Sequence, residues 1–251
     1  MTERMQMQNE VELSPFTEQY HWNGWGFRDT SLTFDKNGDV TVEGTRYPFS
    51  GECFPNFRPF IEEEVKVNVM DESPSQTHAE ACATVPPPVL NEAFLRAIDG
   101  HYRMCSFSNA ERLHHAHGHT AQEIYELRFG KFERVPDLVV WPRSHDDVER
   151  LVQAAHEFDV VLVPYGGGTS VTHAIECPRG ETRMIVSLDM HAMNRVLWVS
   201  RQNLTACIEA GAVGKDIERK LRAMGLTMGH EPDSSELSTM GGWVATRASG
   251  M

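Results

Sequence analysis

The chain has 251 residues, of which 40% are hydrophobic, and its 23 basic and 36 acidic residues give a formal net charge of −13. This length and composition allow one large domain, or a small domain with part of another, and they exclude a disordered chain. An acidic surface repels phosphate backbones, which argues against nucleic acid as a partner. A phosphorylated small ligand remains allowed, because backbone N–H groups can hold an anion without a basic side chain.

The five cysteines are widely spaced and include no CxxC pair. They therefore indicate neither a disulfide framework nor a zinc site, and they favour a reducing compartment. Residues 1–10 are polar and lack the apolar core of a signal peptide, and no run approaches the ~18 apolar residues of a membrane span. A patterned segment continues to the last residue without a polar tail, which predicts a truncated chain.

The N-terminal half is predicted to be a small mixed region. Residues 32–34 and 40–42 alternate as strands do around an Asn-Gly turn, which predicts a β-hairpin. Residues 57–67 and 89–98 have the apolar spacing of helices. Between them, residues 71–88 are rich in Ser, Thr, Pro and charge, which predicts a solvated, mobile linker.

Residues 109–129 predict a further helix that contains a cluster of histidines. Four histidines occupy six positions, namely His114, His115, His117 and His119. In a continuous helix, His115 and His119 would share one face, which is the spacing of a metal-binding pair. Gly118 weakens the helix at this point, and a full ligand set is not evident. We therefore expect histidines that pack or contact another domain, and no metal site.

After residue 130, short β-rich runs alternate with amphipathic helices. Residues 138–141 predict a strand and residues 160–163 a buried strand, with a helix between them that begins at a Ser144 cap, which makes a β-α-β unit. Further strands are predicted at residues 184–188, 196–199 and 204–209, followed by a helix at residues 214–224, with Ile217, Leu221 and Met224 on one face, that ends at Gly225. The predicted fold class is α+β.

A glycine-rich loop follows the strand at residues 160–163. It consists of Pro164, Tyr165, Gly166, Gly167, Gly168, Thr169 and Ser170. Successive glycines let main-chain N–H groups approach a ligand closely, and the two hydroxyls add donors, which suits a pyrophosphate. The loop is neither a Walker loop nor the spaced-glycine dinucleotide fingerprint. Taken alone, a flexible turn explains it equally well.

A second cluster of small residues runs from His230 to Gly250. Backbone so poor in bulky side chains, placed after a strand and a helix, is typical of segments that wrap a cofactor. Because the two loops flank one folding unit, we predict that they share a single ligand.

The order PYGGGTS, IEAG and HEPDSSELSTMGGWVATRASG resembles the flavin-binding domain of the vanillyl-alcohol-oxidase and p-cresol-methylhydroxylase (PCMH) superfamily. The motifs WNGWG, RYPFSG, HHAHGH, FERVPDLVVWPRSHDD and MNRVLWV are more specifically similar to the alkylglycerone-phosphate synthase family. The resemblance covers nearly the whole chain. It implies a PCMH-type FAD-binding domain at residues 131–251, cut short on its C-terminal side, after an N-terminal region at residues 1–130.

The resemblance also implies a flavin-dependent transferase of ether-lipid biosynthesis. Such an enzyme exchanges the acyl chain of acyl-dihydroxyacetone phosphate for a long-chain fatty alcohol, with no net redox change, and FAD acts as a covalent trap for the dihydroxyacetone phosphate portion. Superfamily members that attach flavin through a histidine place it in the glycine loop, where this chain has Thr169 and Ser170, so non-covalent FAD is implied. The family's catalytic tyrosine and histidines would lie beyond Met251, so we expect this chain alone to turn over no substrate.

The resemblance assigns roles to individual residues. The FAD pyrophosphate would be held by residues 164–170. The flavin would be lined by Asp233, Ser234, Ser235, Glu236, Leu237, Ser238 and Thr239, with further FAD contacts from Thr246, Arg247, Ala248 and Ser249. His230 is the candidate catalytic residue, because imidazole can move a proton near neutral pH. A histidine that is merely satisfied in the wall of the site is the alternative.

Two other functions remain open. The first is an FAD-dependent 2-hydroxy-acid dehydrogenase, which shares the flavin half, although WNGWG and the histidine-rich segment favour the synthase. The second is a non-catalytic flavin-binding fragment. The resemblance implies a peroxisomal location, while the chain itself shows no targeting signal. It also leaves open a homodimer and contact with a membrane.

Overall fold

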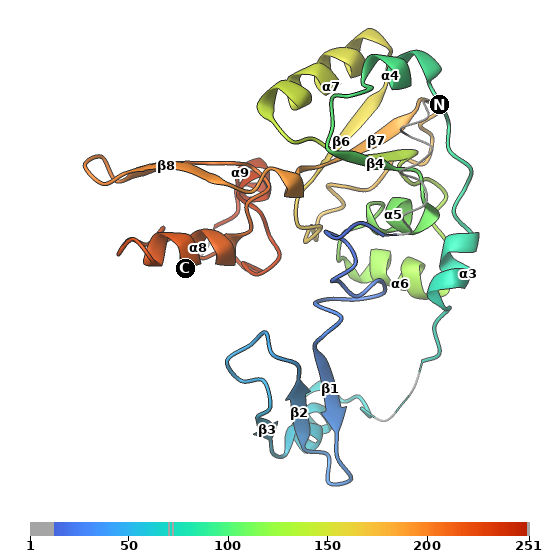
Figure 1. Ribbon diagram of the computed structural model, residues 1–251. Helices are drawn as coiled ribbons and strands as arrows, with labels where there is room; N and C mark the ends of the chain where they lie inside the picture. Colours follow the sequence, from blue (N-terminus) through green and yellow to red (C-terminus); the bar gives the residue numbers. More distant parts are fainter. Residues whose placement is uncertain (1–12, 70, 72, 250–251) are drawn as a thin grey trace.

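The computed structural model describes residues 13–69, 71 and 73–249 (Figure 1). The described strands are β1 (Ser31–Phe34), β2 (Val40–Glu43), β3 (Cys53–Phe54), β4 (Met104–Ser106), β5 (Leu138–Trp141), β6 (Val161–Tyr165), β7 (Ile185–Asp189), β8 (Val196–Ser200) and β9 (Thr205–Ile208). The described helices are α2 (Phe57–Phe60), the π-helix η1 (Ile61–Val65), α3 (His78–Ala83), α4 (Glu92–Ala97), α5 (Asn109–His114), α6 (Ala121–Phe129), α7 (His145–Glu157), the 3₁₀ helix η2 (Met190–Ala192), α8 (Gly214–Arg222) and α9 (Met240–Thr246). The predicted α+β class is confirmed.

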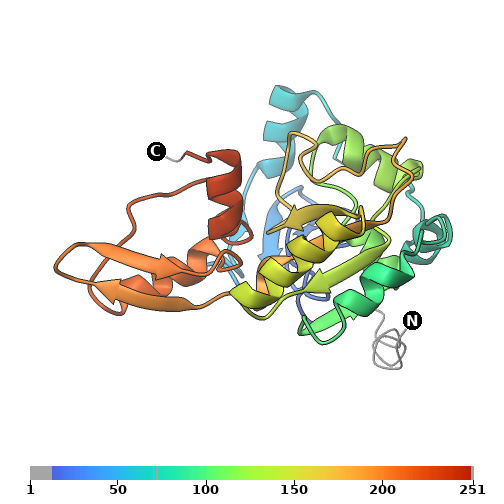
Figure 2. The same ribbon diagram turned by 90° about the horizontal axis from the view of Figure 1, so that it is seen from above.

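A four-stranded sheet with the order β4-β5-β7-β6 forms the centre of the molecule. Strands β5, β7 and β6 are parallel, and β4 pairs antiparallel with β5. All residues of β5 and β7 are buried, as expected for parallel strands covered on both faces. Apolar side chains of α4 and α7 pack on one face, and Figure 2 shows α7 lying along the sheet. On the other face, the His115 ring at the end of α5 contacts Trp141.

Strand β6 lies at the edge of this sheet. The predicted strand is present, but Val161, Leu162 and Val163 are only half-buried, so the prediction of a buried strand was wrong. The reason is that β7 lies between β5 and β6, which leaves β6 paired on one side only. The register aligns Tyr165 with Asp189, so β6 and β7 end at the same edge of the sheet. Ligands bind at this edge in open parallel sheets.

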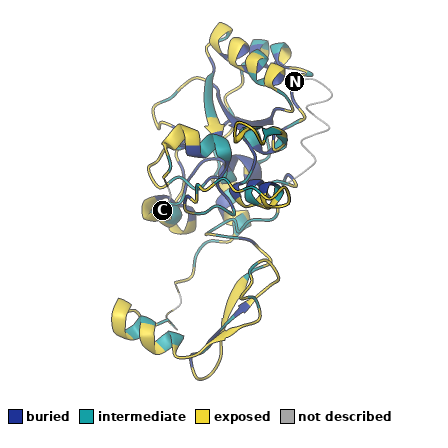
Figure 3. Ribbon diagram, turned by 90° about the vertical axis from the view of Figure 1, so that its left-hand side faces the viewer, coloured by how far each residue is buried: buried dark blue, intermediate teal, exposed yellow. Residues whose placement is uncertain are grey.

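The N-terminal hairpin is confirmed, with Phe34 opposite Val40 and a third strand, β3, added beside β2. In β1–β3, α2 and η1, the buried residues are Val40 and Val42 alone. Figure 3 shows this part largely exposed. The helix predicted at residues 57–67 exists as α2 and η1, and it ends at Val65. Phe60 and Val65 face solvent rather than a core, whereas Phe57 and Ile61 are half-buried.

The segment at residues 71–88 differs from the predicted mobile linker, because α3 lies within it. Thr77 and Glu80 form a complete capping box, which satisfies the first N–H groups of the helix. Ala81 is buried in an apolar cluster with Leu113 and Leu127. Packing therefore fixes this part of the segment. Helix α4 also begins later than predicted, after the Asn91 cap.

Residues 109–129 form two helices rather than one. Helix α5 ends at His114, and α6 begins after Thr120, which forms a second capping box with Glu123. Between them the chain folds against the glycine loop, where a Cβ on Gly118 would lie 2.3 Å from the Ser170 carbonyl oxygen. Because of this break, His115 and His119 share no helix face.

The C-terminal part contains the β8–β9 hairpin, α8 and α9 around a third apolar cluster. Ile217 and Leu221 of α8 are buried as predicted, whereas Met224 is 42% exposed because the helix ends at Arg222. Gly225 follows with φ +71°, which confirms the predicted stop. Helix α9 was not predicted. Within the described part of the chain, no helix combines the length and apolarity needed to cross a bilayer.

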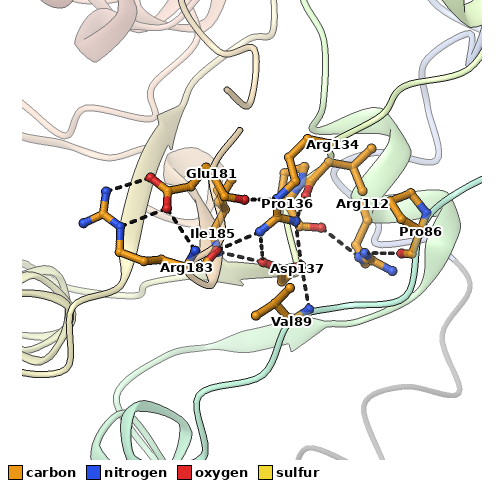
Figure 4. A network of polar contacts seen from close by, with 10 residues as sticks. Pro86, Val89, Arg112, Arg134, Pro136, Asp137, Glu181, Arg183 and Ile185 are labelled. Carbon is orange, nitrogen blue, oxygen red and sulfur yellow. Dashed lines mark hydrogen bonds and ion pairs between the residues drawn. The ribbon is translucent and has the colours of Figure 1, made fainter. Parts of the chain in front are cut away.

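A buried polar network joins the segment before α4 to the central sheet (Figure 4). Both carboxylate oxygens of Asp137 accept hydrogen bonds from Arg134, at 2.8 and 2.6 Å, and Asp137 also accepts from the backbone N–H groups of Val89 and Ile185. Arg112 donates to the carbonyl oxygens of Pro136 and Pro86, both at 2.7 Å. These contacts hold residues 86–89 against the start of β5 and β7.

Candidate functional site

The glycine loop leaves the sheet at the edge where β6 and β7 end. Pro164 and Tyr165, which we predicted as part of the loop, are the last residues of β6. Among the described residues, the backbone N–H groups of Gly167, Gly168 and Thr169 donate no hydrogen bond. Adjacent backbone N–H groups without partners can serve as donors to a phosphate.

The second predicted loop lies directly against the glycine loop. A Cβ on Gly167 would lie 2.1 Å from the Leu237 carbonyl oxygen, and a Cβ on Gly166 would lie 2.4 Å from Oγ1 of Thr239. Only glycine allows the two backbones to approach so closely. The structure therefore places side by side two loops that are about 70 residues apart in the sequence.

The hydroxyl groups at the end of the second loop have structural partners. Ser238 is buried, accepts from Nε1 of Trp243 at 2.7 Å and donates to the Asp233 carbonyl oxygen at 3.3 Å. Thr239 is buried and caps α9 by accepting from the Gly242 N–H. Leu237 is buried as well, whereas Ser234, Ser235 and Glu236 are half-buried and Asp233 is exposed.

The remaining predicted FAD contacts lie at the other end of α9 from Thr239. Thr246, Arg247 and Ser249 are exposed and Ala248 is half-buried. The Ala248 N–H donates to the Trp243 carbonyl oxygen, and Arg247 adopts a left-handed conformation at the end of the helix. No contact that the structure describes joins these four residues to the glycine loop.

His230 precedes the second loop and is half-buried. Its ring packs edge-on against Trp243, with 5.6 Å between ring centroids. Its ring nitrogens make no hydrogen bond to a described residue, so they are available for proton transfer. The catalytic role of His230 stays a prediction.

The histidine segment, residues 114–119, packs on the glycine loop. The His119 N–H donates to the Ser170 carbonyl oxygen at 2.7 Å, and Nδ1 of His119 donates to the Gly168 carbonyl oxygen at 2.9 Å. Our sequence reasoning predicted a packing role for these histidines but missed that they border the site. The glycine between His117 and His119 was the available signal, because it allows this close approach. No group of three metal-ligating side chains occurs in the described ranges.

A buried ionic network, which our sequence reasoning did not predict, lies beneath the loops. Asp189, at the end of β7, accepts from Nε2 of His115 at 2.9 Å and from Nδ1 of His191 at 2.8 Å. Burial lowers the pKa of His115, but the hydrogen bond and charge of Asp189 outweigh it, so the net effect raises this pKa. Burial raises the pKa of Asp189, but the two histidines outweigh it and hold it well below its usual range. The His115 ring lies 4.3 Å from the Tyr165 ring, directly before the glycine loop.

Burial favours the neutral form of His114 and His117. Burial lowers the pKa of His117 to about 4 and holds the pKa of His114 well below its usual range. Residues 20–26, which include the WNGWG motif, lie over the histidine segment, since Tyr20 stacks on His114 and Trp25 packs edge-on against His119. The site is therefore bounded by the N-terminal segment, the histidine segment and the two loops.

Comparison with known proteins shows what the chain is similar to. Residues 136–251 match the family model of an FAD binding domain. An alkyldihydroxyacetonephosphate synthase from Caenorhabditis elegans is 42% identical over 232 residues, which is 92% of this chain and 38% of the worm protein. The chain is a homologue of the alkyldihydroxyacetonephosphate synthases. It spans well under half the length of this relative.

Structural similarity agrees with this assignment. A solved alkyldihydroxyacetonephosphate synthase matches this homologue with a TM-score of 0.85 at 37% identity, over 95% of this chain and 44% of that one. A mitochondrial D-lactate dehydrogenase (cytochrome) from Arabidopsis thaliana is 33% identical, but over only 49% of this chain and 20% of its own length. The likeness to the dehydrogenase is thus confined to about half of the chain, whereas the likeness to the synthases includes the N-terminal region.

The residues of this synthase homologue fit FAD. The three unpaired N–H groups of the glycine loop suit a pyrophosphate, and the adjoining second loop extends the same surface. In addition, the buried Nε2 of His117 beside the glycine loop has no partner among the described residues. FAD is accordingly the cofactor of the domain at residues 136–251.

Proposed function

We propose that the protein is a flavin-dependent transferase of ether-lipid biosynthesis, which exchanges the acyl chain of acyl-dihydroxyacetone phosphate for a long-chain fatty alcohol. The observation that carries the proposal is the row of three backbone N–H groups without partners in the glycine loop, in a chain that aligns over 92% of its length with a synthase. The product would be alkyl-dihydroxyacetone phosphate.

The FAD would be bound non-covalently. Thr169 and Ser170 occupy the part of the loop where a covalent linkage would need a histidine, and neither hydroxyl can replace an imidazole in that bond. Residues 164–170 would hold the pyrophosphate, residues 233–239 would line the flavin, and residues 246–249 would add contacts. When bound, FAD supplies the group that holds the dihydroxyacetone phosphate portion during the exchange.

His230 would move a proton at the reacting centre, because its ring nitrogens are not engaged by the described residues. The N-terminal region at residues 1–130 and the FAD-binding domain at residues 131–251 would both contribute to the site, since Tyr20 and Trp25 lie over the histidine segment. A peroxisomal location, contact with a membrane and a homodimer belong to the same proposal and rest on the family alone.

The first experiment tests the cofactor. The 251-residue chain is titrated with FAD while flavin fluorescence is followed, and the complex is then precipitated with acid. We expect saturable binding, and we expect the flavin to stay in the supernatant after precipitation. Flavin that remains with the precipitated polypeptide would contradict non-covalent binding.

The second experiment tests the reaction. The full-length gene product is incubated with acyl-dihydroxyacetone phosphate and a radiolabelled long-chain alcohol, and the label is followed into alkyl-dihydroxyacetone phosphate. The 251-residue chain, assayed in parallel, is expected to be inactive. Oxidation of D-lactate or another 2-hydroxy acid, in place of exchange, would favour the dehydrogenase and overturn the proposal.

A further inference from the structure

A small cavity lies where the segments of the site meet. Its lining includes Tyr20, His114, His117 and His119, together with Gly167 of the glycine loop and Leu237 of the second loop. The cavity measures about 20 Å³. This is enough for one water molecule or one hydroxyl group, and too little for an aromatic ring.

His117 lines this cavity and carries an unpaired acceptor. Its side chain is 5% exposed and stacks on Phe132, with the two rings 12° from parallel. Nδ1 donates to the Gly118 carbonyl oxygen at 2.8 Å, so the proton of the neutral ring lies on Nδ1 and Nε2 carries a lone pair. Nε2 is buried and has no partner among the described residues. A buried acceptor left unpaired destabilises the fold, which predicts a partner.

We propose that Nε2 of His117 accepts a hydrogen bond from a sugar hydroxyl group of bound FAD, which makes His117 a cofactor-binding residue. The inference rests on the proposed FAD site and adds a residue to it. A ligand that lies across the glycine loop and the second loop reaches this cavity, since Gly167 and Leu237 form part of its wall.

Among the groups of FAD, a sugar hydroxyl fits this cavity and the acceptor on His117 best. A phosphate oxygen carries no proton at neutral pH and cannot donate to Nε2. The flavin and adenine rings carry N–H donors, but neither ring fits into about 20 Å³. The ribityl chain and the ribose of FAD supply hydroxyl groups of the required size.

The matched variant is His117→Phe, which keeps an aromatic ring for the stack on Phe132 and removes the acceptor. We expect the Kd for FAD, measured by fluorescence titration of the 251-residue chain, to rise about 5- to 10-fold, as for the loss of one hydrogen bond. His117→Gln restores an acceptor and should recover part of this loss. The control is His156→Phe on the exposed face of α7, for which we expect an unchanged Kd.

A measurement on the wild-type chain makes the test independent of any variant. In chain labelled with ¹⁵N-histidine, saturation with FAD should shift the Nε2 resonance of His117, because this nitrogen gains a hydrogen bond. Titrations with FMN and with ADP assign the hydroxyl, since the first carries the ribityl chain and the second carries the ribose.

The outcomes separate the two proposals. A wild-type chain that binds no FAD would overturn both the cofactor site and this inference. If wild type binds FAD, an equal Kd for His117→Phe and an unmoved Nε2 resonance would overturn the inference alone. That result would mean that an ordered water, rather than the cofactor, pairs with His117.

Discussion

His115 and His117 lie two positions apart in the sequence, but the partners of their rings favour different protonation states. Both nitrogens of His115 donate, to the Glu111 carbonyl oxygen and to Asp189, so its ring carries a proton on each. His117 has a carbonyl on one side only and no anion in contact, and burial keeps it neutral. The charge of a buried imidazole is thus set by its individual partners, and a run of histidines cannot be treated as one group.

This difference predicts a dependence of stability on pH. The pKa of His117 is about 4 in the folded chain against 6.5 for the free side chain, so the unfolded chain binds the proton first as the pH falls. The stability contributed by neutral His117 is present above pH 6.5 and is lost towards pH 4, by about 3 kcal/mol. The contribution of His115 to stability changes with pH in the opposite direction. Its raised pKa stabilises the folded chain at low pH, and this stability is lost as the pH rises through that pKa.

The measurement is the free energy of unfolding in urea at several values between pH 4.5 and 7, for wild type and His117→Phe. The fall in stability with pH should be shallower in the variant. His115, His119 and Glu123 also act on His117 through their charges, and all three are present in both proteins. Equal slopes would show that His117 is not held neutral.

At the level of elements, the contact between the two loops predicts the effect of a single methyl group. Gly167→Ala would place a Cβ 2.1 Å from the Leu237 carbonyl oxygen, so one loop must move. Such overpacking costs about 1–3 kcal/mol, and we expect the affinity for FAD to fall of order 10-fold in fluorescence titration. Gly180→Ala is the control, since no atom lies within 4 Å of its Cβ position. Unchanged FAD affinity in Gly167→Ala would contradict a role of the loop contact in cofactor binding.

The elements that could be predicted are those with a strong local signal. Strands β5 and β7 are short apolar runs, and α8 has a clear apolar stripe with a glycine stop. Helix α9 contains two glycines, and α3 lies in a polar segment, so neither has an apolar period. Tertiary contacts stabilise them instead, through Trp243 in one and Ala81 in the other.

The same distinction applies to the site. The two loops are visible in the sequence because glycines and small residues mark them. The ionic network is not, since His115 and Asp189 are 74 positions apart and no local pattern in the sequence pairs them. Position in a continuous helix was the wrong basis for pairing His115 with His119, because the fold against Ser170 ends the helix at His114.

At the scale of the molecule, the N-terminal region and the FAD-binding domain share contacts. Strand β4 adds to the central sheet beside β5, although it precedes residue 131. Nε2 of His115 donates to Asp189, and Phe16 stacks on His191. A domain boundary at residue 131 remains a prediction, and contacts cross it in several places.

The Asp137 network predicts the strength of this connection. Asp137→Asn removes the charge that pairs with Arg134 and replaces one acceptor oxygen by a donor group that faces N–H groups. Breaking a buried ion pair costs about 3–5 kcal/mol, and we expect a loss of that size in urea unfolding. Asp159→Asn is the control, because this carboxylate is exposed in its pair with Arg183, and we expect a change within about 0.5 kcal/mol. Equal losses in the two variants would contradict a structural role for the network.

The order of the central sheet also governs when it can assemble during synthesis. Strand β6 leaves the ribosome before β7, yet β7 is its neighbour in the sheet and separates it from β5. Strands β4 and β5 can pair as soon as both have emerged, whereas β6 has no ladder to join until residues 185–189 follow. Until then the glycine loop has no fixed support, and the nascent chain presents an open strand edge of the kind that chaperones shield.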